Sequence, residues 1–438
     1  MTEPAKWLCY NQPFITMTSF ITAISGKMRP SKFTQFSAIA LFTIALAGCG
    51  GGAPTPQPTT TGLKKRVLLS NQQTGTVIIL DAINDKFSSA SMTIGGASRM
   101  ATSGGFTSVI DSNQNLLTIV DNTKEAATAN SISSDRVVDT AMSKDGKTAY
   151  AAVRNTGAVN IVNTADGGTT SLNVPSVSRL VLSPNGTKLL AFVDDPNASV
   201  SNPGGFFVID TANKTVTPIS GPALDQPFTG VFNGSETQAF ILNCGPECGG
   251  TAASVVRVDF SAAPAFSAPI PVSAATVGLL NGSTLFVAGT PVPAIPPATC
   301  NGAGLTKCGT LQGINTGTLI ASAPVIITDG QHVKMQMAGN NRLYVGAVAC
   351  TSVNDGATGL NKGCLTIFNT GASTAVFPEF TASRTSFDVT GLQPISSRNV
   401  VYVCEGGELD IYDTTTDKLT PNQLDVVGKG FDVVQIDP

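Results

Sequence analysis

Seven cysteines after position 49 are the side chains whose type and spacing most clearly predict chemistry. Six of them form close pairs in or beside long loops: Cys244 with Cys248, Cys300 with Cys308, and Cys350 with Cys364. Close thiol pairs either form disulfides or bind a metal as thiolates, and an oxidising compartment favours disulfides. We therefore expect one disulfide within each loop, and the bridge between Cys350 and Cys364 would contribute about 3 kcal/mol in the chain-entropy model.

Little in the sequence supports catalysis. The only histidine is His332, and the chain after residue 48 has no tryptophan to stack on a quinone, no paired-histidine motif and no acidic run typical of a calcium loop. Cys404 is left over, and with no base nearby in sequence it is predicted to be a buried thiol rather than a nucleophile. Acid–base work could fall to Asp194, Asp195, Glu247, Glu405 or Glu408, but loop carboxylates are usually solvated. We predict no catalytic residue, no metal site and no cofactor, and we favour a protein that is not an enzyme.

The first 48 residues have the pattern of a secretion signal. After Met28, the basic residues Arg29 and Lys32 precede an apolar run over residues 33–47 that is too short to span a bilayer stably. The run ends in Leu-Ala-Gly-Cys at positions 46–49, which resembles the lipobox of bacterial lipoproteins. The resemblance implies cleavage before Cys49 and attachment of a diacylglycerol lipid to its sulfur.

These features predict three segments: a signal over residues 1–48, whose true start could be Met28, a lipidated Cys49 with a flexible Gly, Pro and Thr linker over residues 49–62, and a folded part over residues 63–438. In lipoproteins of Gram-negative cells, a residue other than Asp at position 50 implies transfer to the outer membrane, and Gly50 stands there. We therefore expect a protein of the cell envelope, anchored by lipid in the outer membrane.

Charge excludes some partners. Four basic residues and one acidic residue lie in the first 48, which leaves 22 basic and 28 acidic side chains in the remainder. A mildly acidic surface without a basic run lacks the electrostatic footprint needed for phosphate backbones or anionic headgroups. We expect no nucleic-acid partner, and membrane contact through the lipid alone.

Internal repeats predict the fold. Charged residues make up only 13% and Gly and Pro are plentiful, which suits short strands and tight turns. A strand that ends in Asp or Asn recurs eight times, and this side chain can end a strand by accepting a backbone N–H two residues on. The copies span residues 77–81, 117–121, 159–163, 206–210, 255–259, 311–315, 365–369 and 409–413. A second β-rich run precedes each copy, and turns such as residues 143–146 and 183–186 precede several of these.

The repeats resemble those of YVTN-type, lactonase-like β-propellers over about residues 64–438, with blades 5 and 6 departing most. The resemblance implies four-stranded blades around a central channel. The chain starts at a second strand (67–71) and ends with what looks like an innermost strand from Phe431, so the last strand is expected to pair into the first blade. We predict an all-β, single propeller of eight blades, with seven blades as the alternative.

Alignment of the innermost strands brings charged residues to one level of the channel. For blades 1 to 8 the residues are Asp432, Arg99, Asp139, Arg179, Thr229, Thr276, Lys334 and Asp388. Such a ring either holds a small polar or anionic ligand or consists of ion pairs between neighbouring blades, and the second interpretation is favoured because buried charges must be paired.

Long loops predict the binding surface. The connections between second and third strands are short in blades 1 to 3 but long in the next four, over residues 194–204, 244–253, 289–309 and 349–363. They should emerge on one face and on adjacent blades, where function concentrates, although they could also only cover the blade tops. We predict a lipid-anchored binding or scaffold module for a protein or glycan partner on this face of blades 4 to 7. The alternative is a sugar-lactone-type hydrolase with carboxylates at the channel mouth.

Overall fold

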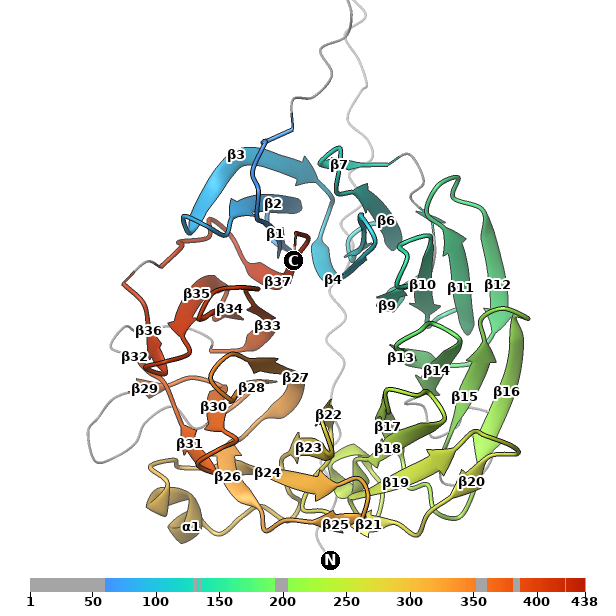
Figure 1. Cartoon of the computed structure of the whole chain (residues 1–438), viewed down its shortest axis with the longest axis vertical. Coiled ribbons are helices and arrows are strands. Elements are labelled where there is room, and N and C mark those ends of the chain that lie inside the picture. Colours follow the sequence, from blue (N-terminus) through green and yellow to red (C-terminus); the bar gives the residue numbers. More distant parts are fainter. Residues whose placement is uncertain are drawn as a thin grey trace, which may run out of the picture. The chain divides into compact units, whose positions relative to one another are not determined.

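The computed structural model describes residues 60–128, 132–133, 135–193, 204–351, 361–380, 387–421 and 423–437. Cys49, the predicted signal and most of the predicted linker lie outside these residues, as do Asp194 and Asp195. Within the described residues the chain forms eight antiparallel four-stranded blades arranged in a ring (Figure 1). The predicted eight-bladed propeller is confirmed, and the seven-bladed alternative is wrong. No helix in the described ranges is long and apolar enough to cross a membrane.

Each blade runs from an innermost strand at the axis to an outer strand at the rim. In blades 1 to 4 the strands, from inside outward, are β37 (Gly430–Gln435), β1 (Arg66–Asn71), β2 (Thr76–Asp81) and β3 (Lys86–Thr93); β4 (Ala97–Ser103), β5 (Phe106–Asp111), β6 (Leu116–Asp121) and the short β7 (Ala126–Ala127) and β8 (Ile132–Ser133); β9 (Val137–Met142), β10 (Thr148–Val153), β11 (Ala158–Asn163) and β12 (Thr169–Asn173); β13 (Val177–Leu182), β14 (Lys188–Val193), β15 (Gly205–Asp210) and β16 (Thr215–Ser220).

Blades 5 to 8 continue the pattern with more interruptions. Their strands are β17 (Pro227–Phe232), β18 (Gln238–Asn243), β19 (Ser254–Asp259), β20 (Ala265–Phe266) and β21 (Ile270–Pro271); β22 (Val277–Asn281), β23 (Thr284–Gly289), β24 (Cys308–Asn315), β25 (Ile320–Ala321) and β26 (Val325–Thr328); β27 (Gln331–Ala338), β28 (Arg342–Val348), β30 (Leu365–Asn369) and β31 (Thr374–Val376); β33 (Val389–Pro394), β34 (Val400–Glu405), β35 (Glu408–Asp413) and β36 (Lys418–Leu419). A separate pair joins β29 (Asn361–Lys362) to β32 (Glu379–Phe380), and two short helices, η1 (Gly245–Cys248) and α1 (Pro297–Gly302), lie in loops.

The hydrophobic core lies between blades rather than within any one of them. Leu68 and Val77 of blade 1 pack against Met100 and Val109 of blade 2, and similar clusters join the other neighbours. A single small sheet cannot bury both of its apolar faces, so each blade is stable only against its neighbours.

The turn that follows each third strand explains the repeated Asp or Asn. The Asp121 carboxylate accepts hydrogen bonds from the backbone N–H groups of Thr123 (2.9 Å) and Lys124 (3.1 Å). The Asn369 side chain does the same for Gly371 (3.0 Å). The predicted mechanism for ending these strands is therefore confirmed.

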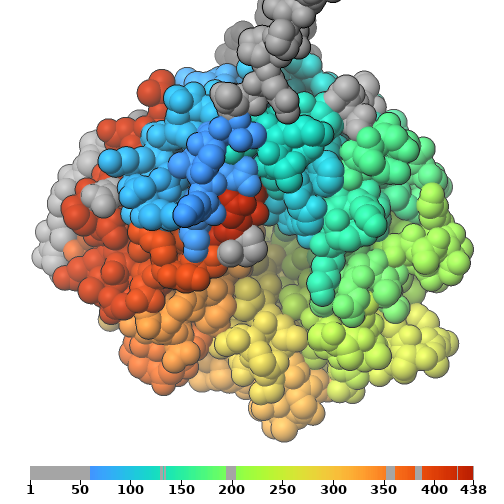
Figure 2. Space-filling view, turned by 45° about the horizontal axis from the view of Figure 1, so that its top comes forward, coloured from blue at the N-terminus to red at the C-terminus, as the bar shows by residue number. Residues whose placement is uncertain are grey.

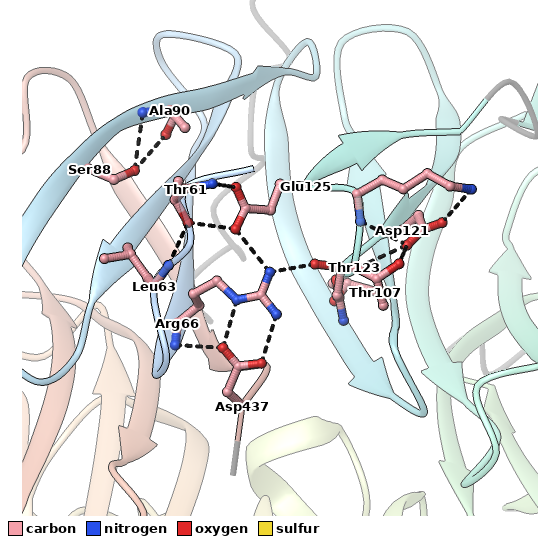
Figure 3. A network of polar contacts seen from close by, with 12 residues as sticks. Thr61, Leu63, Arg66, Ser88, Ala90, Thr107, Asp121, Thr123, Glu125 and Asp437 are labelled. Atoms are coloured by element: carbon pink, nitrogen blue, oxygen red, sulfur yellow. Dashed lines mark hydrogen bonds and ion pairs between the residues drawn. The ribbon is translucent and has the colours of Figure 1, made fainter. Parts of the chain in front are cut away.

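Ring closure follows the predicted pattern. Strand β37 pairs antiparallel with β1, with Leu69 opposite Val433. At the start of β1, the Arg66 guanidinium binds both carboxylate oxygens of Asp437 (2.7 and 2.8 Å) and one of Glu125 in blade 2 (2.9 Å) (Figure 3). Thr61 donates its hydroxyl to Glu125 (2.6 Å), so the first described residues are bound to blade 2. Residues from both ends of the propeller therefore meet at one ion-pair network.

The propeller has two chemically different faces. We call the edge where second strands end the loop face; it carries the connections from second to third strands, which follow Asn71, Val153, Val193, Asn243, Gly289 and Val348. We call the opposite edge, which carries Arg66 and Asp437, the closure face. A six-residue strand separates the two by about 17 Å. Figure 2 shows the molecule obliquely, with a hollow at the centre of the ring.

Candidate functional site

The long loops of blades 5, 6 and 7 are each closed by a disulfide, as predicted. The bridges join Cys244 to Cys248, Cys300 to Cys308 and Cys350 to Cys364, with Cα atoms 5.6 to 5.7 Å apart. Cys404 is a free, fully buried thiol, and burial raises its pKa well above the ordinary value. The fourth predicted loop, over residues 194–204, lies almost wholly outside the described residues, and the blade 7 loop lies partly outside.

Aspartates just before the innermost strands of blades 5 and 7 accept hydrogen bonds from the backbone of the disulfide loops. The Asp225 carboxylate accepts from the backbone N–H groups of Thr251 and Ala252 (both 2.8 Å) in the blade 5 loop. In blade 7, Asp329 accepts from Thr351 N (3.0 Å). Sequence analysis missed both aspartates, although each stands two residues before the innermost strand of a blade with a disulfide loop. Together with the disulfides they fix the base of the loops in blades 5 and 7.

The loops are also linked from blade to blade. Glu247 in η1 accepts from Thr290 N of blade 6 (3.0 Å), and the Thr290 hydroxyl donates to Gly330 O at the start of blade 7 (2.8 Å). Burial raises the pKa of Glu247 to about 7. The disulfide loops of blades 5 and 6 are therefore bonded to each other, and the blade 6 loop is bonded to the start of blade 7.

The loop of blade 6 is uncharged and rich in apolar residues. Residues 290–306 contain no charged side chain and include the sequence Pro-Val-Pro-Ala-Ile-Pro-Pro over positions 291–297. Val292 is 53% exposed, one of few large hydrophobic side chains so open in the described chain. Proline restricts the backbone before any partner arrives, so contact here loses little conformational entropy.

Charged residues of the innermost strands meet at one level near the loop face. In every blade except blade 6, the described pairing of the innermost and second strands contains a register shift. The shift places Asp432, Asp139, Arg179 and Lys334 at equivalent positions directly after it, and Arg99 within it. A bulge of this kind turns a side chain out of the regular ladder.

The two carboxylates at this level bind groups on other blades. Asp139 pairs with Arg99 (2.9 Å) of blade 2 and also accepts from Leu180 N (2.8 Å) of blade 4. Asp432 pairs with Lys334 (2.9 Å) of blade 7 and accepts from Met100 N (3.0 Å) of blade 2. The Arg99–Asp139 pair joins neighbouring blades, as the sequence favoured, whereas the Lys334–Asp432 pair spans blade 8. Both carboxylates also accept from backbone groups that the sequence did not predict.

Two aligned positions were wrong. Val389 pairs with Glu405 and Gly391 with Cys404, so Gly391 and not Asp388 occupies the equivalent position in blade 8. Asp388 precedes β33, and its carboxylate accepts from Ala349 N (2.6 Å) in the blade 7 loop. Thr276 likewise precedes its strand. In blade 8 the alignment failed because the bulge adds a residue at a point that only the partner strand defines, and in blade 6 it failed because the described pairing contains no such bulge.

The remaining acid–base candidates are not gathered into a cleft. Glu405 is fully buried and accepts from the Tyr412 hydroxyl (3.1 Å). His332 is fully buried beside Thr328 O (3.0 Å), and burial lowers its pKa to about 4, so it is neutral at physiological pH. Glu247 is thus the candidate carboxyl whose pKa lies near neutrality on the loop face.

Sequence analysis missed an apolar groove at the rim. Its volume is about 690 Å³, and Phe286, Leu311, Ile320 and Phe368 of blades 6 and 7 are among its lining residues.

A Ser-Ala-Pro sequence at positions 267–269 and again at 322–324 splits the outer strands of blades 5 and 6. In each blade the serine hydroxyl accepts a backbone N–H of the third strand. Proline cannot extend the ladder, which protects these edges from pairing with another chain.

Comparison with known proteins identifies the fold. No family model and no curated protein matches the sequence. Among solved structures, the dihydro-heme d1 dehydrogenase NirN in complex with DHE covers 88% of this chain and 78% of its own, with 11% identity and a TM-score of 0.64. Apo AztD from Citrobacter koseri covers 85% and 97%, with 13% identity and a TM-score of 0.57. BamB from Moraxella catarrhalis covers 83% and 93%, with 11% identity and a TM-score of 0.50. At these identities the similarity shows a shared β-propeller fold and nothing about ligands.

Proposed function

We propose that this protein is a binding module for a protein or glycan partner, held in the cell envelope by lipid on Cys49, with the loop face of blades 4 to 7 as the contact surface. One observation carries the proposal: three adjacent blades have disulfide-closed loops, the loops of blades 5 and 6 are bonded to each other, and the blade 6 loop is uncharged and exposes Val292. Loops on a rigid scaffold are where binding residues concentrate.

The position of the tether supports this assignment. The described chain begins at Thr60, and Thr61 and Arg66 lie on the closure face, opposite the loops. In this proposal the linker joins the propeller at its closure face, so it leaves the loop face free for a partner. The outer-membrane location implied by Gly50, the YVTN-type assignment of the repeats and the absence of a nucleic-acid partner belong to the same proposal.

Photo-crosslinking in living cells tests the contact surface. Val292 on the loop face and Ile83 in a closure-face turn are 53% and 52% exposed, which makes them a matched pair of sites. A photo-reactive amino acid at position 292 should give an adduct of defined mass, and the same residue at position 83 should not. Equal adducts at both sites, or none at position 292, would contradict the proposal.

Replacement of the predicted lipidated residue tests the tether. Cys49→Ser should abolish incorporation of labelled fatty acid and move the protein from the membrane fraction to the soluble fraction. Cys404→Ser is the matched control, because the buried thiol is not a lipidation site. Lipid incorporation that survives Cys49→Ser would disprove the anchor.

A hydrolase of sugar lactones is the second candidate function, and Glu247 favours it. A carboxyl with a pKa of about 7 can exchange protons at neutral pH. Wild-type protein should then hydrolyse lactones, and Glu247→Gln should lose that turnover without loss of fold. No turnover by the wild type would eliminate this candidate.

A further inference from the structure

We infer that the outer edge of blade 3 binds an extended polypeptide segment that carries an acidic side chain. The edge is strand β12, at the rim of the propeller (Figure 1). An extended segment can add to such an edge as a further strand, because the outermost strand of a sheet has unpaired backbone N–H and C=O groups. The site goes beyond the proposed loop-face partner, since it lies on the rim and uses other residues.

The outer edges of the other blades are interrupted within the described ranges. Pro218 lies in β16 of blade 4, and a register shift interrupts the pairing of β3 with β2 in blade 1. The edges of blades 2, 5 and 6 are each divided between two short strands, and the outer strands of blades 7 and 8 have three and two residues. Proline, bulges and short edge strands prevent strand addition. Strand β12 has five residues, no proline and no register shift in its pairing with β11.

Every second residue of β12 directs its backbone groups outward. Val174 N donates to Gly157 O (2.8 Å) just beyond the end of β12, so Val174 belongs to a hydrogen-bonded pair. Such pairs alternate along an antiparallel ladder, and every second residue counted back from Val174 therefore faces β11. The residues between them are exposed and direct their N–H and C=O groups away from the sheet, and these are Thr169, Ser171 and Asn173.

Blade 4 has the same position blocked. Ser171 of β12 pairs with Asn160, the third residue of β11, and Pro218 of β16 pairs with Phe207, the third residue of β15. Proline has no N–H, so blade 4 lacks the outward donor that blade 3 presents at the equivalent position. Two adjacent blades with outer strands of similar length therefore differ in whether another strand can add.

A lysine beside the edge determines the charge of the expected ligand. The Lys214 ammonium, from a turn of blade 4, donates to the Thr170 hydroxyl (3.1 Å), and no carboxylate of the described chain pairs with it. Opposite residues on adjacent strands place their side chains on the same face, so an acidic residue opposite Thr170 can reach this ammonium. Leu172 lies on that face and packs against the core between blades 3 and 4, which favours an apolar residue opposite it.

Hydrogen exchange of the purified full chain in uncharged detergent, with and without a synthetic peptide, tests the inference. The probe is Ser-Thr-Val-Thr-Glu-Thr-Ser, capped at both ends, which places valine opposite Leu172 and glutamate opposite Thr170 in an antiparallel pairing. Binding should slow exchange of the outward amides of Thr169, Ser171 and Asn173, and the concentration at half-maximal protection gives the affinity. Replacement of the peptide glutamate by lysine should weaken binding about fivefold, as expected for one exposed ion pair.

Ser171→Pro should weaken binding about tenfold, because it removes an outward donor as Pro218 does in blade 4. Ser171→Ala is the matched control. It loses the same hydroxyl, which donates to Asn160 Oδ1 (2.7 Å), but keeps the backbone N–H, so it should bind like the wild type.

Lys214→Gln should abolish the preference for glutamate over lysine in the peptide. Lys144→Gln, which removes the same charge from an exposed side chain in a closure-face turn of blade 3, should keep that preference. Lys214→Gln alters only an exposed side chain, so it decides the outcome if Ser171→Pro lowers the unfolding midpoint.

Three results would each overturn the inference. The peptide leaves exchange of the outward amides unchanged, Ser171→Ala weakens binding as much as Ser171→Pro, or Lys214→Gln keeps the preference for glutamate. None of these results affects the crosslinking test of the loop face, because Val292 lies in the blade 6 loop.

Discussion

Arginines on the closure face join blades 7, 8, 1 and 2, whereas disulfides on the loop face close the loops of blades 5, 6 and 7. Arg342 binds Asp417 of blade 8 (2.6 Å), Arg398 binds Asp85 of blade 1 (2.9 Å) and Arg66 binds Glu125 of blade 2 (2.9 Å). Each carboxylate follows a third strand in the next blade and has a left-handed backbone, with φ between 52° and 58°. At three successive blade junctions near the two chain ends, the same position in the turn after the third strand therefore binds an arginine of the preceding blade.

The ion pairs and the disulfides differ in how far apart in sequence the segments they join are. Arg66 and Asp437 are 371 residues apart, and Arg398 and Asp85 are 313 apart, so these ion pairs join segments that meet only in the closed ring. The disulfides span 4, 8 and 14 residues and constrain only local loops. Ion pairs on the closure face therefore stabilise the ring, and disulfides on the loop face shape a surface.

Removal of a closure arginine should have the largest effect. Arg66→Ala leaves two carboxylates without their cation, and we expect a loss of about 4 kcal/mol in the free energy of unfolding, since a broken, partly buried pair costs this much. Denaturant unfolding measures the loss. Lys147→Ala, at an exposed pair 3.9 Å apart, should cost less than about 0.5 kcal/mol. Equal losses in the two variants would show that Arg66 has no special part in closure.

Removal of a disulfide should have a smaller and more local effect. Replacement of Cys350 and Cys364 by serine should cost about 3 kcal/mol, and replacement of Cys244 and Cys248, which close a shorter loop, about 2 kcal/mol. Hydrogen exchange should increase in the affected loop while the β1–β37 pairing stays protected. Increased exchange across β37 would contradict the separation of the two roles.

Titration of Glu247 should have the smallest effect. Burial raises its pKa to about 7 in the folded protein, and its pKa is about 4.3 in an unfolded chain. The folded state holds the proton more tightly, so the contribution of this group to stability is complete below about pH 4 and is lost as the pH rises through about 7. Glu247→Gln should match the wild type near pH 4 and exceed it at pH 8 by less than about 1 kcal/mol, because the group is partly solvated. Glu379→Gln, which removes the same charge from a side chain 45% exposed, is the matched control in these unfolding measurements.

The fold could be predicted because its strongest signal is local. An Asp or Asn that binds backbone N–H groups two and three residues on, as Asp210 does with Ala212 and Asn213, marks the end of a strand without reference to any other part of the chain. Eight such marks at a regular period predict the ring, and the apolar strand at residue 431 predicts its closure.

The site was predicted less completely because its contacts join segments distant in sequence. Arg99, Asp139, Arg179, Lys334 and Asp432 could be aligned, since the bulge follows the turn at a nearly constant spacing. Asp388 could not, because its place depends on the register with β34. Asp225 and Asp329 act on backbone groups of loops 22 or more residues away, and a single sequence carries no signal for such pairs.

The hydrogen bonds of Thr61 determine which blade first bears a mechanical load applied to the preceding chain. Both its backbone N–H and its hydroxyl bind Glu125 of blade 2, five residues before Arg66 begins β1. Tension on the chain ahead of Thr60 is therefore transmitted first to the second blade and only then to the seam between β1 and β37. Under the proposed lipid anchor, a pull on the chain would be shared by two blades, which would protect the seam from being peeled open one residue at a time.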